Sequence, residues 1–91
     1  MREFEIKPKL RKILDKLHKK DRKTYNAVMQ KIEEVLRSEG IEHYKNLRHD
    51  LKQFSRVHIG SFVLVFSYNK QSDFVIFIDY DHHDNIYKTG S

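Results

Sequence analysis

A chain of 91 residues holds one domain with a modest core and leaves no room for a second. It has 18 basic against 13 acidic residues and a net charge of +5, which favours an acidic partner, and its hydrophobic fraction of 38% indicates a globular chain. The lack of cysteine excludes disulfides and thiolate metal sites, and no apolar run is long enough to span a bilayer, so we expect a cytoplasmic protein without membrane contact.

A strand and two helices are predicted in the first part of the chain. Phe4 and Ile6 alternate with charged residues as in a short strand, and Pro8 suits the first turn of a helix that ends near residues 18–20. Asp21 is well placed to cap a second helix, which Gly40 should stop. Each helix has one apolar stripe at helical spacing, so the two should form a hairpin that faces the core. The stripes are Leu10, Ile13, Leu14 and Leu17, then Tyr25, Val28, Met29, Ile32, Val35 and Leu36.

Positive charge is concentrated on the first helix and the turn that follows it. Between Lys7 and Lys23 nine basic residues stand against only two acidic ones, Asp15 and Asp21, which leaves this segment with a net charge of +7. Such a segment supplies the sequence-independent part of nucleic-acid binding, and a solvated helix face would show the same pattern. Nucleic-acid binding is the favoured of these two interpretations.

Three strands are predicted in the second half of the chain. Residues 41–53 form a polar segment whose secondary structure the sequence does not indicate. The first strand begins at Phe54, and residues 60–61 and 69–73 are turns of a length typical of antiparallel hairpins. The order of a strand, two helices and three strands predicts an α+β fold.

Side chains alternate along these strands and should therefore divide between two faces of the sheet. Arg56 and His58 fall on one face, and both are residue types suited to phosphate binding and proton transfer at neutral pH. In the last strand, strict alternation places Tyr80 with Ile78 on the face opposite Phe77. One face must cover the helical hairpin, and the other is expected to be partly open.

Three features of the second half carry a resemblance to a known family. They are Leu47 before the sheet, the run Arg56-Val57-His58-Ile59-Gly60-Ser61-Phe62-Val63-Leu64-Val65-Phe66, and the closing His82-His83-Asp84-Asn85-Ile86-Tyr87. In these features and in the order of its elements, the chain resembles the RelE/ParE toxin superfamily over essentially its whole length. The resemblance implies an N-terminal strand, a helical hairpin and a curled antiparallel sheet, in a single domain over residues 1–88 with a tail at residues 89–91.

The resemblance also implies a function. RelE-type members of archaea and bacteria are ribosome-dependent endoribonucleases that cut messenger RNA in the decoding site and are neutralised by a wrapped, RelB-like antitoxin in a hetero-oligomer. ParE-type members inhibit gyrase instead. Arg56, His58, His83 and Tyr87 match the RelE-type nuclease site, with histidines at 58 and 83 where a lysine or arginine is usual. Val63 stands where many members have an arginine, so the resemblance implies that Val63→Arg leaves activity equal or higher.

The implied chemistry is attack of a ribose 2′-hydroxyl on the neighbouring phosphate. This reaction needs a base, an acid and positive charge on the phosphoryl oxygens, but neither a metal nor another cofactor. We therefore expect Arg56 to hold the phosphate, and His58 and His83 to transfer protons in an order that the sequence does not fix.

Three further residues have two open interpretations each. Tyr87 either stacks on an unpaired base or helps to orient the phosphate, or it is a packing anchor near the end of the chain. Arg48 and Lys52 either contact the RNA backbone or are solvated loop residues. For the whole protein, the alternatives to the nuclease are a ParE-like gyrase inhibitor and a non-catalytic basic RNA-binding module.

The run from Asp79 to Asp84 joins carboxylates with two histidines, a combination that can bind a divalent ion. No spacing motif supports a metal site, and successive side chains at a strand end are expected to point in different directions. No metal is therefore predicted, and His82 is expected to act as a turn or capping residue.

Overall fold

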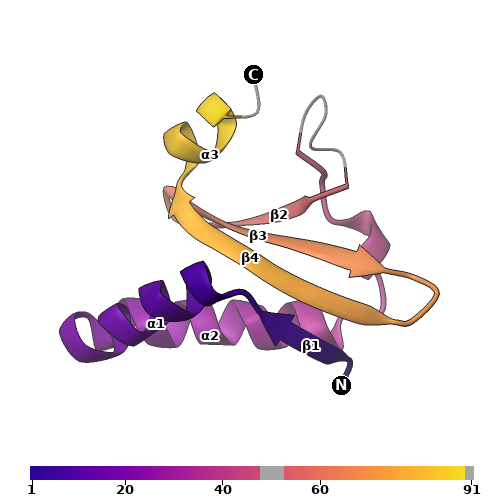
Figure 1. Cartoon of the computed structure of the whole chain (residues 1–91), viewed down its shortest axis with the longest axis horizontal. Helices are drawn as coiled ribbons and strands as arrows, with labels where there is room; N and C mark the ends of the chain where they lie inside the picture. The colour runs from indigo at the N-terminus through magenta and orange to yellow at the C-terminus, as the bar shows by residue number, and fades with distance from the viewer. Residues whose placement is uncertain (48–52, 90–91) are drawn as a thin grey trace.

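The computed structural model describes residues 1–47 and 53–89, with the backbone alone for residues 87–89. Within these residues a four-stranded sheet lies over a helical hairpin, and a short helix lies on the other side of the sheet (Figure 1). The elements are β1 (Glu3–Ile6), α1 (Pro8–Lys20), α2 (Arg22–Arg37), the 3-10 turn η1 (Ile41–His43), β2 (Ser55–Ile59), β3 (Phe62–Asn69), β4 (Phe74–His82) and α3 (His83–Thr89). The predicted α+β class and the order of a strand, two helices and three strands are confirmed.

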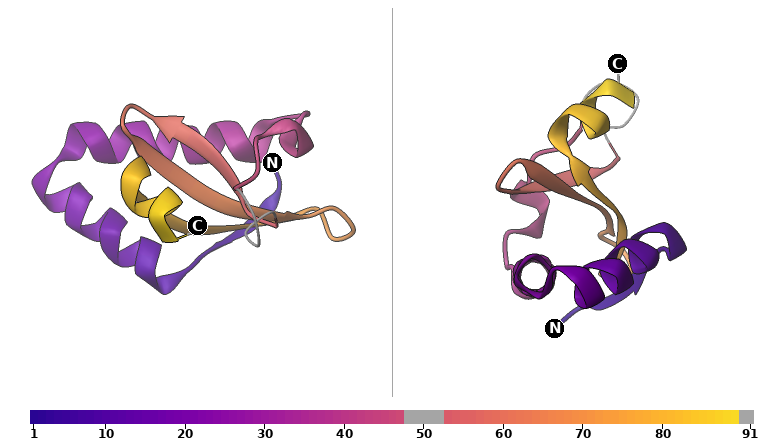
Figure 2. Two further views of the ribbon diagram at one scale, coloured as in Figure 1. Left: turned by 90° about the horizontal axis from the view of Figure 1, so that it is seen from above. Right: turned by 90° about the vertical axis from the view of Figure 1, so that its left-hand side faces the viewer.

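The strands lie side by side in the order β1-β4-β3-β2. β2, β3 and β4 pair as successive antiparallel hairpins, as predicted, whereas β1 pairs parallel with β4. Figure 2 shows the twisted sheet from above, with the β3–β4 turn and the α1–α2 turn at opposite ends of the molecule. β4 is thus a central strand, although it is the last of the four along the chain.

The two long helices begin and end where the sequence indicated. α1 begins at Pro8 and ends at Lys20, and α2 ends before Gly40. Asp21 caps α2, because its carboxylate accepts hydrogen bonds from the hydroxyl of Thr24 (2.6 Å) and from its backbone N–H (3.1 Å). These two bonds hold the pKa of Asp21 below its ordinary value. No helix among the described residues is long and apolar enough to cross a membrane.

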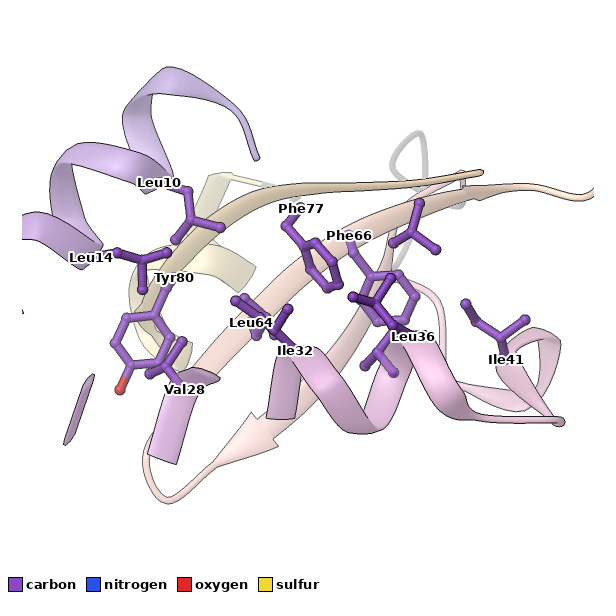
Figure 3. Packing of buried hydrophobic residues seen from close by; sticks show 12 residues of the cluster. Leu10, Leu14, Val28, Ile32, Leu36, Ile41, Leu64, Phe66, Phe77 and Tyr80 are labelled. Carbon is purple, nitrogen blue, oxygen red and sulfur yellow. The ribbon is translucent and has the colours of Figure 1, made fainter. Parts of the chain in front are cut away.

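The main core lies between the helical hairpin and the face of the sheet that we call the inner face. Figure 3 shows Phe66, Phe77 and Tyr80 pointing from the strands toward the apolar side chains of α1 and α2. Phe66 and Phe77 are fully buried, and a large apolar side chain buried in this way stabilises the fold by roughly 1.5–3 kcal/mol. The helical stripes are core, as predicted.

The predicted position of Tyr80 is wrong. The pairing of β3 with β4 shifts between Val65 and Phe66, so that Val65 lies opposite Asp79 while Phe66 lies opposite Phe77. Ile78 is the extra residue of this β-bulge, and a bulge interrupts the alternation of side chains. Tyr80 therefore joins Phe77 in the inner core, while Ile78 packs on the other side of the sheet.

The side of the sheet away from α1 and α2, which we call the outer face, has a smaller apolar cluster of its own. Its buried members come from β3, from α3 and from the segment before β2, and they are Leu47, Val63, Val65 and Ile86. Ile86 anchors α3 on this face, where Figure 1 shows the helix opposite α1 and α2. The sequence analysis predicted no helix here, so α3 is a feature that only the structure reveals.

Arg2 joins three distant segments of the chain. Its guanidinium donates hydrogen bonds to the carboxylate of Asp73 (2.8 Å) and to the carbonyls of Leu36 (3.1 Å) and Ser38 (2.5 Å), and it lies 5.5 Å from the centre of the Tyr68 ring. The Tyr68 hydroxyl donates to Asp73 at 2.6 Å. The bonds from Tyr68 and then Arg2 hold the pKa of Asp73 below its ordinary value. The network ties the N-terminus, the end of α2 and the β3–β4 turn together.

Ionised Asp73 should therefore stabilise the fold in a pH-dependent way. Since its pKa is lower in the folded chain than the value of about 3.9 of an unfolded chain, the contribution is present above about pH 4 and is lost as the pH falls through the folded pKa. We expect Asp73→Asn to lower the melting temperature near neutral pH, and the difference from wild type to shrink as the pH is lowered. Asparagine is the matched replacement because Asp73 has a φ of 53°, which asparagine also tolerates. Equal melting temperatures near neutral pH would contradict this role.

Candidate functional site

Arg56 and His58 stand on the outer face of β2, the strand at one edge of the sheet. Being two residues apart on a strand, they share a face. The register places Arg56 opposite Val65 and His58 opposite Val63, and both valines belong to the outer apolar cluster. The predicted common face is confirmed, and it is the face that carries α3.

The two side chains also contact each other. Nη1 of Arg56 lies 2.8 Å from Nε2 of His58. Since a guanidinium can only donate, Nε2 accepts this hydrogen bond, and the neutral ring then carries its proton on Nδ1. Arg56 is half-buried and His58 is exposed. The pair therefore presents a permanent positive charge next to an imidazole that has an accepting nitrogen.

His83 reaches the same end of the sheet as the first residue of α3. Its backbone N–H donates to the carbonyl of Ser61 (3.0 Å), in the turn that joins β2 to β3 shortly after His58. Three residues further on, Ile86 is buried in the outer cluster. These two attachments fix the start of α3 beside the β2–β3 turn.

Strand geometry sets the separation between the two sides of this site. Val63 on β3 pairs with His58 on one side and with Asp81 of β4 on the other. Neighbouring strands lie about 4.8 Å apart, so the backbones at His58 and Asp81 are about 10 Å apart. The outer face thus has Arg56 and His58 at one border, the start of α3 at the other, and an apolar strip between them.

Asp81 organises the start of α3. Its carboxylate accepts hydrogen bonds from Nδ2 of Asn85 (3.0 Å) and from the backbone N–H of His82 (2.7 Å). These bonds, with the one from Asn85 foremost, hold the pKa of Asp81 below its ordinary value. The sequence analysis gave neither Asp81 nor Asn85 a role. The signal that could have found them is their spacing of four residues, which suits side-chain contact at the start of a helix.

His82, His83 and Asp84 converge, and the expectation that they point in different directions is wrong. The two imidazole rings stack with centroids 4.4 Å apart. Nδ1 of His83 lies 3.0 Å and Nδ1 of His82 lies 3.6 Å from the Asp84 carboxylate. Alternation fails because β4 ends at His82 and α3 begins at His83. The capping role expected of His82 is confirmed, since its Nδ1 accepts the backbone N–H of Asp84 at 3.2 Å.

No family model matches the chain. Over 97% of its length and 93% of the relative's, however, it is 55% identical to the candidate toxin RelE4 of Methanocaldococcus jannaschii. The chain belongs to the RelE family of toxins. The resemblance on which the sequence analysis relied is confirmed.

Solved structures confirm that this RelE-type toxin has the RelE fold. The toxin–antitoxin complex RelBE2 from Mycobacterium tuberculosis contains a chain that matches with a TM-score of 0.71 and 21% identity, over 90% of this chain and 98% of that one. The isolated RelE toxin of Escherichia coli matches with a TM-score of 0.63 and 16% identity, over 99% of this chain and 95% of that one. At these identities the likeness concerns the fold alone.

Three residues predicted for the RelE-type site have described side chains, namely Arg56, His58 and His83. They lie at the same end of the outer face. Tyr87 belongs to α3, but its side chain lies outside the described part. Arg48 and Lys52 also lie outside the described residues. The roles of all three therefore stay predictions.

Val63, where many RelE-type members have an arginine, is fully buried in this toxin. It lies in the outer cluster with Ile86, beneath α3. An arginine at this position would have to displace α3 or place its charge in an apolar cluster. The structure therefore predicts that Val63→Arg lowers stability and activity, whereas the family resemblance implies equal or higher activity.

The basic segment from Lys7 to Lys23 covers α1 and the start of α2. α1 buries Leu10 and Leu14 in the inner core, and Figure 1 shows α1 and α3 on opposite sides of the sheet. Lys9 is ion-paired with Asp79 at 3.0 Å. Because Asp79 lies opposite Val65 of the outer cluster, Lys9 joins the basic segment to the β4 side of the outer face.

Proposed function

We propose that this RelE-type toxin is a metal-independent endoribonuclease that cleaves messenger RNA on the ribosome and thereby inhibits translation. The observation that carries the proposal is the contact between Arg56 and His58 on the face that also carries His83. Together they supply one permanent positive charge and two groups suited to proton transfer near neutral pH. Membership of the RelE family supports the same activity.

In the proposed reaction the ribose 2′-hydroxyl attacks the adjacent phosphorus, which gives a 2′,3′-cyclic phosphate and releases the 5′-oxygen of the next nucleotide. Arg56 turns from His58 to the phosphoryl oxygens, two of which a guanidinium can bind at once. Once Arg56 has moved, Nε2 of His58 accepts the proton of the 2′-hydroxyl. His83 then donates a proton to the departing 5′-oxygen.

The contacts of the two histidines support this order of proton transfer. His58 accepts a hydrogen bond from Arg56, so it presents the lone pair that a base needs. Nδ1 of His83 lies 3.0 Å from the carboxylate of Asp84. This carboxylate can accept a hydrogen bond from Nδ1–H when the ring carries a proton on each nitrogen. An acid needs that form, so we assign His58 as the base and His83 as the acid.

Cell-free translation with the protein added tests the proposal. Ribosome-bound messages should acquire new 5′ ends, and the same messages without ribosomes should not. If translation continues while DNA supercoiling is blocked, the protein is a ParE-like gyrase inhibitor. If the protein binds RNA and no new ends form, it is a non-catalytic RNA-binding module.

We also propose that a RelB-like, acidic antitoxin holds this toxin in an inactive hetero-oligomer. The solved relative from M. tuberculosis is a toxin–antitoxin complex, and the net charge of +5 favours an acidic partner that folds as it wraps.

If the cations of α1 contribute to the complex, its affinity should fall as salt is added, because salt screens exposed charges. Calorimetric titration of the antitoxin at low and high salt measures this effect. Lys16→Ala combined with Lys20→Ala, two exposed positions one turn apart on α1, should reduce the salt dependence. A salt-independent affinity would remove the basic segment from the interface.

A further inference from the structure

The junction of β4 with α3 gathers three potential metal ligands that the proposed cleavage does not need as a group. One ligand atom each from His82, His83 and Asp84 can be chosen so that all three lie within 4.8 Å of one another. The carboxylate of Asp84 lies 3.0 Å from Nδ1 of His83 and 3.6 Å from Nδ1 of His82. Two nitrogens and a carboxylate thus face one small volume.

These separations suit a first-row transition metal. Zinc binds imidazole nitrogen at about 2.0–2.1 Å and carboxylate oxygen at about 2.0–2.2 Å, which in a tetrahedral site puts neighbouring ligand atoms about 3.4 Å apart. The observed separations are 3.0 Å from Nδ1 of His83 to Oδ1 of Asp84 and 3.6 Å from Nδ1 of His82 to Oδ2, on either side of that value. Two imidazoles and one carboxylate favour Zn²⁺ or Ni²⁺ over Mg²⁺ and Ca²⁺, which prefer oxygen ligands.

The backbone that carries the three ligands is held in place from several sides. Asp81 accepts the backbone N–H of His82 and the side chain of Asn85, and the backbone N–H of His83 is bonded to Ser61. Little of the chain therefore has to be reordered when an ion binds, which lowers the cost of binding.

Nδ1 of His82, one of the proposed ligand atoms, directs its lone pair at the backbone N–H of Asp84, and a bound ion would replace this contact. Nδ1 of His82 accepts a long hydrogen bond, 3.2 Å, from the backbone N–H of Asp84, so this nitrogen carries no proton in that contact. The side chains of His82, His83 and Asp84 are 37%, 42% and 75% exposed, so an ion can enter from solvent and keep water in its remaining coordination positions.

We propose that His82, His83 and Asp84 form a binding site for one divalent transition-metal ion, with Zn²⁺ and Ni²⁺ as its ions of choice. The ion binds Nδ1 of both histidines and the carboxylate of Asp84. As a consequence, which rests on the proposed function, a bound ion inhibits cleavage, because His83 coordinated through Nδ1 no longer acts as the acid. The metal is thus an inhibitor of a reaction that proceeds without it.

Calorimetric titration of the tag-free, chelator-treated chain with Zn²⁺, Ni²⁺ and Mg²⁺ tests the site directly. We expect one equivalent of Zn²⁺ or Ni²⁺ to bind and Mg²⁺ to give no signal. His82→Ala, His83→Ala and Asp84→Ala should each weaken Zn²⁺ binding by about tenfold to a hundredfold, since even the loss of an outer partner of a ligand has an effect of this size. His18→Ala, on the exposed surface of α1, is the matched control and should bind Zn²⁺ like the wild type.

Two results would overturn the site: no saturable Zn²⁺ binding by the wild-type chain, or equal affinities in the wild type and His82→Ala. Because binding is measured without RNA or ribosomes, this outcome is independent of whether the protein cleaves RNA. In the cleavage assay, Zn²⁺ should lower the rate, and a zinc chelator should restore it. Asp84→Ala should raise the half-inhibitory Zn²⁺ concentration by the same factor as its dissociation constant. Zn²⁺ binding without any cleavage at zero Zn²⁺ would refute the proposed function and leave the site standing.

Discussion

Replacing His58 with glutamine should slow messenger-RNA cleavage by about a hundredfold or more, the usual scale for the loss of a general base. Glutamine keeps similar size and polarity and can still accept a hydrogen bond from Arg56, but it cannot take up the proton of the 2′-hydroxyl. His83→Gln should have an effect of the same order, because it removes the proposed acid. The measurement is the rate at which new 5′ ends appear on messages bound to excess ribosomes.

Arg56→Ala should slow cleavage by a similar factor for a different reason. In the proposed reaction it removes the positive charge on the phosphoryl oxygens in the transition state, and such a loss typically slows a reaction by about a hundredfold to a thousandfold. The pH dependence of the rate separates the two causes. Each histidine variant should lose one limb of a bell-shaped profile, whereas Arg56→Ala should keep both limbs at a lower rate.

Ribosome binding should be largely kept in these three variants, because many other cations, including those of α1, are unchanged. His18→Gln is the matched control for a histidine outside the site. If His58→Gln and His83→Gln both cleave at the wild-type rate, the assignment of proton transfer is wrong. The catalytic groups would then have to be sought among Arg48, Lys52 and Tyr87 or on the ribosome.

Val63→Arg should destabilise the fold by about 3 kcal/mol or more, since an unpaired charge in an apolar cluster is among the most costly single changes. Val63 is fully buried beneath α3, and Asp81, its neighbour on β4, is already bonded to His82 and Asn85. The total stability of a small domain is about 5–15 kcal/mol, so the loss should be plain in urea unfolding. Any variant protein that stays folded should have α3 displaced and should cleave more slowly.

Ser67→Arg is the matched control for this variant. Ser67 lies four residues further along β3, on the same face as Val63, where it lines an open pocket of about 540 Å³. An arginine there can extend into solvent, so its effect on stability should stay below about 1 kcal/mol. If Val63→Arg is as stable and as active as the wild type, then α3 can move aside without loss of stability, and the expectation drawn from the family resemblance holds.

The parts of the fold that the sequence predicts are those encoded locally. The apolar stripes of α1 and α2, Pro8 and the cap at Asp21 each lie within a few residues of the structure they cause. The bulge that moves Tyr80 to the inner face depends on how β4 pairs with β3, and nothing within β4 itself indicates it. α3 has only seven residues, too few to be predicted from local preference alone. It is held by the packing of Ile86 against Val63, and this contact is known only from the folded structure.

The candidate site divides in the same way. That Arg56 and His58 share a face follows from their spacing of two residues on a strand, which can be read from the sequence. The hydrogen bond between them is seen in the structure alone. The convergence of His82 and His83 could not be predicted, because it arises where a strand changes into a helix and the rule of alternation no longer applies.

The parallel pairing of β1 with β4 has a consequence for synthesis of the protein. β1 emerges first from the ribosome, but its partner residues in β4 lie about seventy positions later in the chain, beginning at Phe74 opposite Glu3. The α1–α2 hairpin rests on contacts close in sequence and can form early, whereas closing so long a loop is slow and comes late. Because α3 follows β4 directly, the border of the outer face that holds His83 is completed only after the last strand is made. A nascent chain therefore has no finished toxin site while most of its length is still being translated.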